Sequence, residues 1–304
     1  MYLLNLIRWK NLLMIALVQL LIKYALLEPY GAQTRLDGLG ISLLILACIC
    51  IAAAGNIIND IYDVETDFIN KPKRLIVGTF ISEKTAYNLF IAFNIMGVGI
   101  GFYVSHLVDK SAFFSMFVIT SALLYIYASY LKRILLIGNI VISLLVALSI
   151  VMVGVFELLP DINHHNQNTQ LAFFKIIFNY ALFAFMINML REIAKDLEDI
   201  NGDYKAGMNT LPIAIGRKRT NHVLIALMFI SIIILIYYVT EVLYKQLILV
   251  GYFLIFCVGP LLFILLKTFN AKTKKDYHSI SNGLKIIMLF GMLSLSLYLV
   301  ILRA

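Results

Sequence analysis

The chain has 304 residues, of which 62% are hydrophobic and only 14% are charged. This composition excludes a soluble globular domain and a disordered chain, because both need far more polar surface. We read the net charge of +8 as a membrane-topology signal with some attraction to anionic lipid, and nothing in the sequence suggests a nucleic-acid partner.

Nine apolar runs follow one another along the chain, each near the length of about 20 residues that crosses a bilayer. The first is expected over residues 12–29. Because no small-residue cleavage site follows it, we expect it to be kept as a membrane helix rather than removed as a signal peptide. The other runs are expected at 39–58, 86–107, 112–131, 134–158, 170–190, 222–243, 246–266 and 283–302. The sequence therefore predicts an all-α, polytopic membrane protein with nine transmembrane helices in a single bundle, residues 1–304 forming one membrane domain.

Positive charge predicts the orientation of these helices, because Lys and Arg in short loops stay on the cytoplasmic side. Most of the 25 basic residues lie before the first helix or after the second, fourth, sixth and eighth helices. We therefore expect the N-terminus to lie on the cytoplasmic side. The membrane itself is expected to be a prokaryotic cytoplasmic (inner) membrane. Two long polar segments, residues 59–85 and 191–220, would form cytoplasmic loops rich in Asp.

The polar segment after the second helix opens with an acid cluster. Asn59, Asp63 and Asp67 are four residues apart, so their side chains stack along one face of a helix, and Asp60 lies beside them. Basic residues follow this cluster directly: Lys71, Lys73 and Arg74.

A second acid cluster is predicted after the sixth helix, on the same membrane face. Asp199 and Asp203 repeat the four-residue spacing, and Asp196 adds a carboxylate about one turn earlier. Three further cations are placed near it or on the same face: Arg191, Lys195 and Lys132.

These oxygen-only clusters suit a hard cation such as Mg²⁺, which is commonly shared with substrate phosphates, and the lack of sulfur and imidazole argues against zinc. Metal and basic residues together could bind a diphosphate and help an allylic ester to ionise, with its hydrocarbon chain among the apolar helices. Solvated surface charge would explain one such cluster, whereas two on the same face favour a site. Two rival functions stay open: a lipid-binding scaffold without catalysis, and a cation-coupled transporter, although transporter sites usually lie near the bilayer midplane.

The chain resembles the UbiA superfamily of intramembrane prenyltransferases. Members carry Asn-Asp-x-x-Asp-x-x-x-Asp after helix two and Asp-x-x-x-Asp after helix six, which residues 59–67 and 199–203 match. The similarity extends to residues 70–72 and 210–212. It implies a Mg²⁺-dependent prenyltransferase that uses a polyprenyl diphosphate and a lipid or aromatic acceptor.

The resemblance also implies roles for individual residues. The implied metal ligands are Asn59, Asp60, Asp63, Asp67, Asp196, Asp199 and Asp203, and the catalytic residues among them are Asp63, Asp67, Asp199 and Asp203. The implied contacts of the diphosphate are Lys71, Arg74, Lys132, Arg8, Asn11 and Lys195.

Two classes of acceptor are compatible with this hypothesis. Residues 191–203 most resemble the branch that transfers geranylgeranyl to geranylgeranylglycerol phosphate in ether-lipid synthesis. An aromatic acceptor of quinone biosynthesis, of the 4-hydroxybenzoate or dihydroxynaphthoate type, is the alternative. For the phosphate of a glycerol lipid, Arg217, Lys218 and Arg219 are candidate partners.

Overall fold

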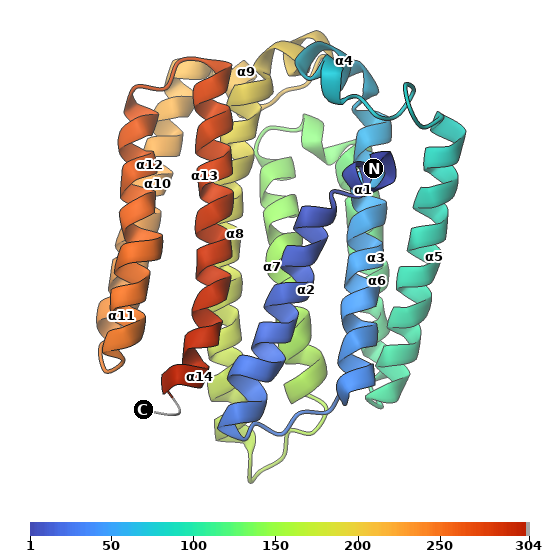
Figure 1. Cartoon of the computed structure of the whole chain (residues 1–304). Coiled ribbons are helices and arrows are strands. Elements are labelled where there is room, and N and C mark those ends of the chain that lie inside the picture. Colours follow the sequence, from blue (N-terminus) through green and yellow to red (C-terminus); the bar gives the residue numbers. More distant parts are fainter. Residues whose placement is uncertain (302–304) are drawn as a thin grey trace.

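The computed structural model describes residues 1–301, apart from the side chain of Arg74. Within these residues, nine helical segments are long and apolar enough to cross a membrane, which confirms the predicted number. They run side by side as one all-α bundle, with the N-terminal end of the chain near the same end of the bundle as α4 and α9 (Figure 1).

The nine segments combine long helices with shorter pieces. Their bounds are Trp9–Tyr30 (beginning with α2, Trp9–Leu21), Gly38–Tyr62 (α3), Glu83–Leu107 (α5), Ser111–Ser129 (containing α6, Phe114–Ser129), Ile137–Leu158 (α7), Gln167–Lys205 (α8), Arg217–Glu241 (α10), Leu247–Phe269 (α11, Leu247–Phe253, and α12, Gly259–Phe269) and Lys274–Ile301 (α13, Lys274–Leu293, and α14, Leu297–Ile301). Three short α-helices of the described residues lie outside them: α1 (Tyr2–Leu6), α4 (Val64–Asn70) and α9 (Leu211–Ile215).

The sixth spanning segment differs most from its predicted length. The apolar run ends near residue 190, yet α8 continues to Lys205, so the second acid cluster is part of this helix and not of a loop. The extension is amphipathic: Ile193 and Leu197 are fully buried in the core, while Asp196 and Asp199 lie on the cavity side. Mean hydropathy does not detect such a stretch, because the charged residues on one face lower the average that the apolar residues on the other face raise.

The first acid cluster lies at a junction between two helices. Asn59 and Asp60 belong to the last turn of α3, and Asp63 separates α3 from α4. The helix α4 carries Asp67 and ends where Lys71 precedes Pro72. The four-residue spacing therefore spans a bend, and the side chains still line one cavity.

A buried ion pair joins the first spanning segment, just after the end of α2, to α7 at the end of the bundle opposite to the acid clusters. Lys23 Nζ lies 3.0 Å from Glu157 Oε1, and the two side chains are 1% and 0% exposed. The backbone of Leu36 satisfies both groups further, since its carbonyl accepts from Lys23 and its N–H donates to Glu157 Oε2 at 3.1 Å. Full pairing is what allows two charges to be buried here.

Candidate functional site

The side chain of Asn70 joins the two acid clusters. Its Nδ2 donates to the backbone oxygen of Asp199 at 2.9 Å, and its Oδ1 accepts from the backbone N–H of Gly202 at 3.0 Å. This approach requires glycine at position 202, because a Cβ there would lie 2.3 Å from Asn70 Nδ2. The end of α4 is therefore fastened to the last turns of α8, and segments far apart in the sequence form one site.

The two clusters line the polar end of a cavity of about 910 Å³. The sequence-predicted site residues that line it are Arg8, Asn11, Asn59, Asp60, Asp63, Asp67, Lys71, Lys132, Lys195, Asp196, Asp199 and Asp203. The remaining one is Arg74, whose side chain lies outside the part that the structure describes. Away from the acids, the cavity continues between α2, α3, α6 and α7 along apolar side chains such as Phe117, Leu145 and Leu148.

A lysine from a different element pairs with each acid cluster. Lys132, from the turn before α7, places its Nζ 2.6 Å from Asp63 Oδ1, and its side chain is only 8% exposed. Lys71 forms an ion pair with Asp199. Burial by itself lowers the pKa of Lys71, but attraction by Asp199 outweighs this, so that the pKa lies above its ordinary value. Lys71 therefore stays charged, and the two ion pairs offset part of the negative charge of the clusters.

The entrance to the first spanning segment adds a third ion pair. Arg8 Nη2 lies 2.7 Å from Asp60 Oδ1, and the charge of Asp60 raises the pKa of the guanidinium. Arg8 itself has a left-handed backbone conformation with φ of 54°, which separates α1 from α2 and turns the chain. This ion pair therefore links the N-terminal segment to the last turn of α3.

Several carboxylate oxygens at the site lack hydrogen-bond donors. Asp203 is 9% exposed, and no described side chain donates a hydrogen bond to its carboxylate. Asp199 Oδ1 is buried without a hydrogen-bond partner. Burial, together with repulsion from Asp63, raises the pKa of Asp67 to about 6. Such a concentration of acid is costly unless a cation joins it.

The donor set fits Mg²⁺ because every candidate ligand is an oxygen. Within residues 1–301, however, three or more His, Cys, Asp or Glu side chains do not come close enough together to form a complete metal site. This arrangement fits a cation whose coordination is completed by substrate phosphates better than a cation held by protein alone.

The structure adds three residues that sequence reasoning missed. Asn139, near the start of α7, donates to Asp196 Oδ2 at 2.8 Å. His278 on α13 lies 3.1 Å from Glu198, which is 7% exposed. Glu198 stands inside the second cluster but off its four-residue spacing, whereas Asn139 and His278 are isolated polar residues without any signal in the sequence.

The basic residues proposed for an acceptor phosphate lie elsewhere. Arg217, Lys218 and Arg219 are exposed in the first turn of α10, and none of them lines the cavity. Arg217 Nη1 instead donates to the backbone oxygen of Lys272 at 3.2 Å. The structure therefore does not bring these three candidates to the cavity, because sequence position alone does not show which way the start of α10 faces.

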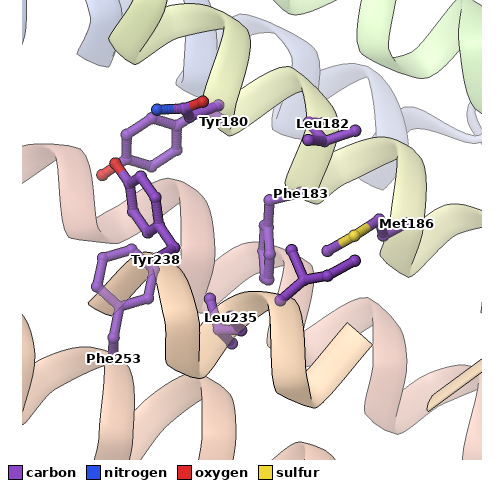
Figure 2. A pocket seen from close by; sticks show the side chains of 9 residues that line it. Tyr180, Leu182, Phe183, Met186, Leu235, Tyr238 and Phe253 are labelled. Atoms are coloured by element: carbon purple, nitrogen blue, oxygen red, sulfur yellow. The ribbon is translucent and has the colours of Figure 1, made fainter. Parts of the chain in front are cut away.

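A second cavity, of about 60 Å³, lies between α8, α10 and α11. Figure 2 shows Phe183, Met186, Leu235 and Phe253 around it. The hydroxyl of Tyr180 is already paired with Ser294 Oγ at 2.7 Å. No acidic or basic side chain of the described residues lines this cavity, so the chemistry that the sequence predicts belongs to the larger one.

Comparison with known proteins identifies related chains. A family model described as the UbiA prenyltransferase family matches residues 17–296. A digeranylgeranylglyceryl phosphate synthase of Methanobrevibacter smithii is 31% identical over 261 residues, covering 84% of this chain and 86% of the relative. A protein of the same name from Methanococcoides burtonii is 32% identical over 279 residues, covering 91% of each chain.

Solved structures share the fold. A structure described for digeranylgeranylglyceryl phosphate synthase matches 98% of both chains with a TM-score of 0.62 and 25% sequence identity. A UbiA homologue from Archaeoglobus fulgidus bound to GPP and Mg²⁺ covers 97% of this chain and 100% of that chain, with a TM-score of 0.57. At 18% identity, this second match shows the fold alone.

Proposed function

The chain belongs to the UbiA prenyltransferase family, and we propose that this integral membrane prenyltransferase moves a geranylgeranyl group from its diphosphate to geranylgeranylglyceryl phosphate, with Mg²⁺ as cofactor. One observation carries the proposal: both acid clusters and their lysines line the polar end of a cavity whose other end is apolar. The names of the relatives support the acceptor, and the Archaeoglobus fulgidus homologue bound to GPP and Mg²⁺ supports the donor class and the metal.

We assign the polar end of the cavity to the diphosphate. The proposed metal ligands are Asn59, Asp60, Asp63, Asp67, Asp196, Asp199 and Asp203, and the proposed diphosphate contacts are Lys71, Arg74, Lys132, Arg8, Asn11 and Lys195. Bound Mg²⁺ would neutralise the negative charge that develops on the leaving diphosphate. Lys132 and Lys71 add positive charge at the same place.

In this proposal, Lys132 and Lys71 exchange their carboxylate partners for phosphate oxygens when the substrate binds. Before substrate binds, Lys132 pairs with Asp63 and Lys71 pairs with Asp199. As phosphate oxygens arrive, the ammonium groups turn to them and release the carboxylates, so that buried charge stays paired in both states. The bond between the allylic carbon and the diphosphate then breaks, with its electron pair leaving on the diphosphate. The acceptor oxygen forms the new carbon–oxygen bond, and its proton passes to the departing diphosphate.

The depth of the cavity supports a chain of four isoprenoid units. On α3 and α7, the lining residues farthest along the helix from the acids are Cys48 and Met152, which lie 12 residues from Asp60 and 13 residues from Asn139. At a rise of 1.5 Å per residue, these separations correspond to about 18 to 20 Å. An extended chain advances about 1.2 Å per bond, so the 16 bonds of four units need about 19 Å.

Changing the deep end of the cavity is expected to change the preferred chain length. Cys48→Leu should fill space and lower kcat/KM for the C20 diphosphate about 10-fold relative to the C15 diphosphate, whereas Met152→Ala should shift preference toward longer chains. Competition assays with C15, C20 and C25 diphosphates measure this ratio. Met96→Ala, at an exposed position on α5, is the matched control, and equal ratios in all variants would contradict the assignment.

Cation affinity is expected to fall in mild acid. The pKa of Asp67 is raised to about 6, and a metal ligand must be deprotonated, so this carboxylate favours binding above pH 6 and ceases to do so as the pH falls through 6. From this group alone, the half-saturating Mg²⁺ concentration should rise about 10-fold between pH 8 and pH 5. Activity titrations with Mg²⁺ at each pH measure it, and Asp67→Asn should flatten the dependence.

Orientation and domain organisation remain part of the proposal. We place the acid clusters and the N-terminus on the cytoplasmic side of the inner membrane, because the basic residues gather at that end. Residues 1–304 would then form one membrane domain. Labelling of single cysteines at Ser82 and Asn163, which lie in turns at opposite ends of the bundle, would report the two sides in intact cells.

Purified protein with Mg²⁺ and geranylgeranyl diphosphate tests the function directly, with geranylgeranylglyceryl phosphate and 4-hydroxybenzoate offered separately. We expect diphosphate release and prenylation of the glycerol lipid, both lost in Asp63→Ala. Prenylation of the aromatic acid alone would assign the protein to quinone biosynthesis. Failure of every acceptor, with diphosphate binding unchanged by the substitution, would contradict the proposed site.

A further inference from the structure

Three basic side chains that line the cavity have few acids to pair with. They are Lys10 on α2, Arg191 on α8 and Lys285 on α13, named here the basic cluster. Within the described part of the chain, Glu192 is the one carboxylate within ion-pair distance of them, at 3.6 Å from Arg191 Nη1. It lies closer to Lys195, at 2.8 Å. The basic cluster therefore carries an excess of positive charge, unlike the lysines at the acid clusters.

The geometry of the basic cluster suits an oxyanion. Lys285 donates to Asn11 Oδ1, which links α13 to α2 and holds the ammonium at the cavity wall. Arg191 is only 16% exposed, and its Nε is buried with no hydrogen-bond partner among the described residues. A guanidinium presents its donors as a rigid fork that matches phosphate oxygens. A bound anion would satisfy donors that the protein itself leaves without partners.

The basic cluster adjoins the proposed diphosphate site, since Lys285 contacts Asn11, and it extends from there deeper along α8. Arg191 precedes Asp199 by eight residues on α8, which places it about 12 Å along the helix toward the membrane interior. In a glycerol phosphate, four bonds separate a neighbouring hydroxyl oxygen from phosphorus, or about 5 Å when extended. An acceptor phosphate at the basic cluster would thus leave its hydroxyl between the cluster and the diphosphate, where the allylic carbon must lie.

We propose that the basic cluster binds the phosphate monoester of the acceptor lipid. The inference rests on the proposed function and names a part of the site that Arg217–Arg219 do not provide. A phosphate monoester carries a charge of about −1.5 to −2 at pH 7, and three cations facing one carboxylate balance it better than they balance a singly charged aromatic acid.

Direct binding tests the inference without any turnover. The probes are geranylgeranylglyceryl phosphate and the same lipid without its phosphate, offered to the full-length protein in the absence of donor. We expect wild type to bind the phosphate form at least 10-fold more tightly. Arg191→Gln and Lys285→Gln should each reduce this ratio about 10-fold, because each removes a charge-assisted contact. Lys218→Gln, at an exposed basic residue off the cavity, should leave the ratio unchanged.

Kinetics provide the second readout. Lys285→Gln should raise KM for the acceptor about 10-fold. KM for the prenyl diphosphate should rise much less, because Lys285 reaches the diphosphate site only through Asn11. An equal rise in KM for the diphosphate, or a binding ratio unchanged in both variants, would overturn the inference. Wild type that prenylates no glycerol lipid would contradict the proposed function instead, and the binding ratio would still decide the role of the cluster. Lys285 is half-buried, so its variant serves if Arg191→Gln does not fold.

Discussion

Asp203→Asn is expected to lower prenyl transfer about 100- to 1,000-fold and at the same time to raise thermal stability in the absence of Mg²⁺ and substrate. The carboxylate is 9% exposed and receives no hydrogen bond from a described side chain, so its charge destabilises the unliganded protein. In the proposed reaction, the same charge binds the cation that stabilises the leaving diphosphate, and loss of one such interaction typically has an effect of this size. Asparagine keeps the shape while removing the charge.

Two measurements on the purified protein check this expectation. Product formation gives the loss of activity, and the midpoint of thermal unfolding with and without Mg²⁺ and diphosphate gives the stability. Glu65→Gln is the control, because Glu65 is an exposed acid on α4 that does not line the cavity, and both of its values should match wild type. If Asp203→Asn lost stability along with activity, its carboxylate would be a structural group and not a cation ligand.

Asn70→Ala is expected to lower kcat/KM about 100-fold, although Asn70 is not itself a proposed metal ligand. The substitution removes both hydrogen bonds that fasten α4 to α8, at Asp199 and Gly202. The two acid clusters would then no longer be held at one separation, and a misplacement of about 1 Å can cost a factor of about 100 in rate. Steady-state kinetics over a range of Mg²⁺ concentrations measure the effect.

The dependence on Mg²⁺ concentration distinguishes a role of Asn70 in positioning the two acid clusters from the simple loss of a polar side chain. We expect Asn70→Ala to need more Mg²⁺ for half-maximal activity. Each acid cluster would keep its own carboxylates, but the two clusters would no longer be held at the separation that binds Mg²⁺ and diphosphate together. Asn201→Ala removes an exposed asparagine from the same turns of α8 and should behave as wild type. Gly202→Ala should resemble Asn70→Ala, because its added Cβ would displace the Asn70 side chain. Normal activity in both variants would show that the junction does not position the clusters.

The contact between α4 and α8 illustrates what sequence reasoning cannot reach. Asn70 was recognised as part of a matching motif, but its partners are backbone groups more than 120 residues away. The same holds for Asn139 and for His278, each of which contacts the second acid cluster from another helix. None of these pairings follows a local periodicity. They depend on which helices are neighbours and on how far each is turned about its axis.

The length of α8 is a second feature that the sequence did not predict. An apolar run was read as the whole helix, although the helix continues for about four more turns through the acids to Lys205. Hydropathy reports the part that lies in hydrocarbon, whereas the hydrogen-bonded helix extends wherever one face can still be buried. The carboxylates predicted as metal ligands nevertheless line one cavity, because spacing by four is a local property that does not depend on where the helix ends.

The sequence alone determined that this is an all-α membrane protein with nine apolar spans, and that its acids fall into two clusters with basic neighbours. Hydropathy and helical periodicity are properties of adjacent residues, so they can be read without knowing the fold. Only the tertiary structure decided that Lys132 and Lys71 pair with different clusters, that Arg191 and Lys285 share one cavity, and that this cavity extends as far as Cys48 and Met152. Those features depend on which of the nine apolar helices pack against one another. Shape complementarity among many side chains determines that packing.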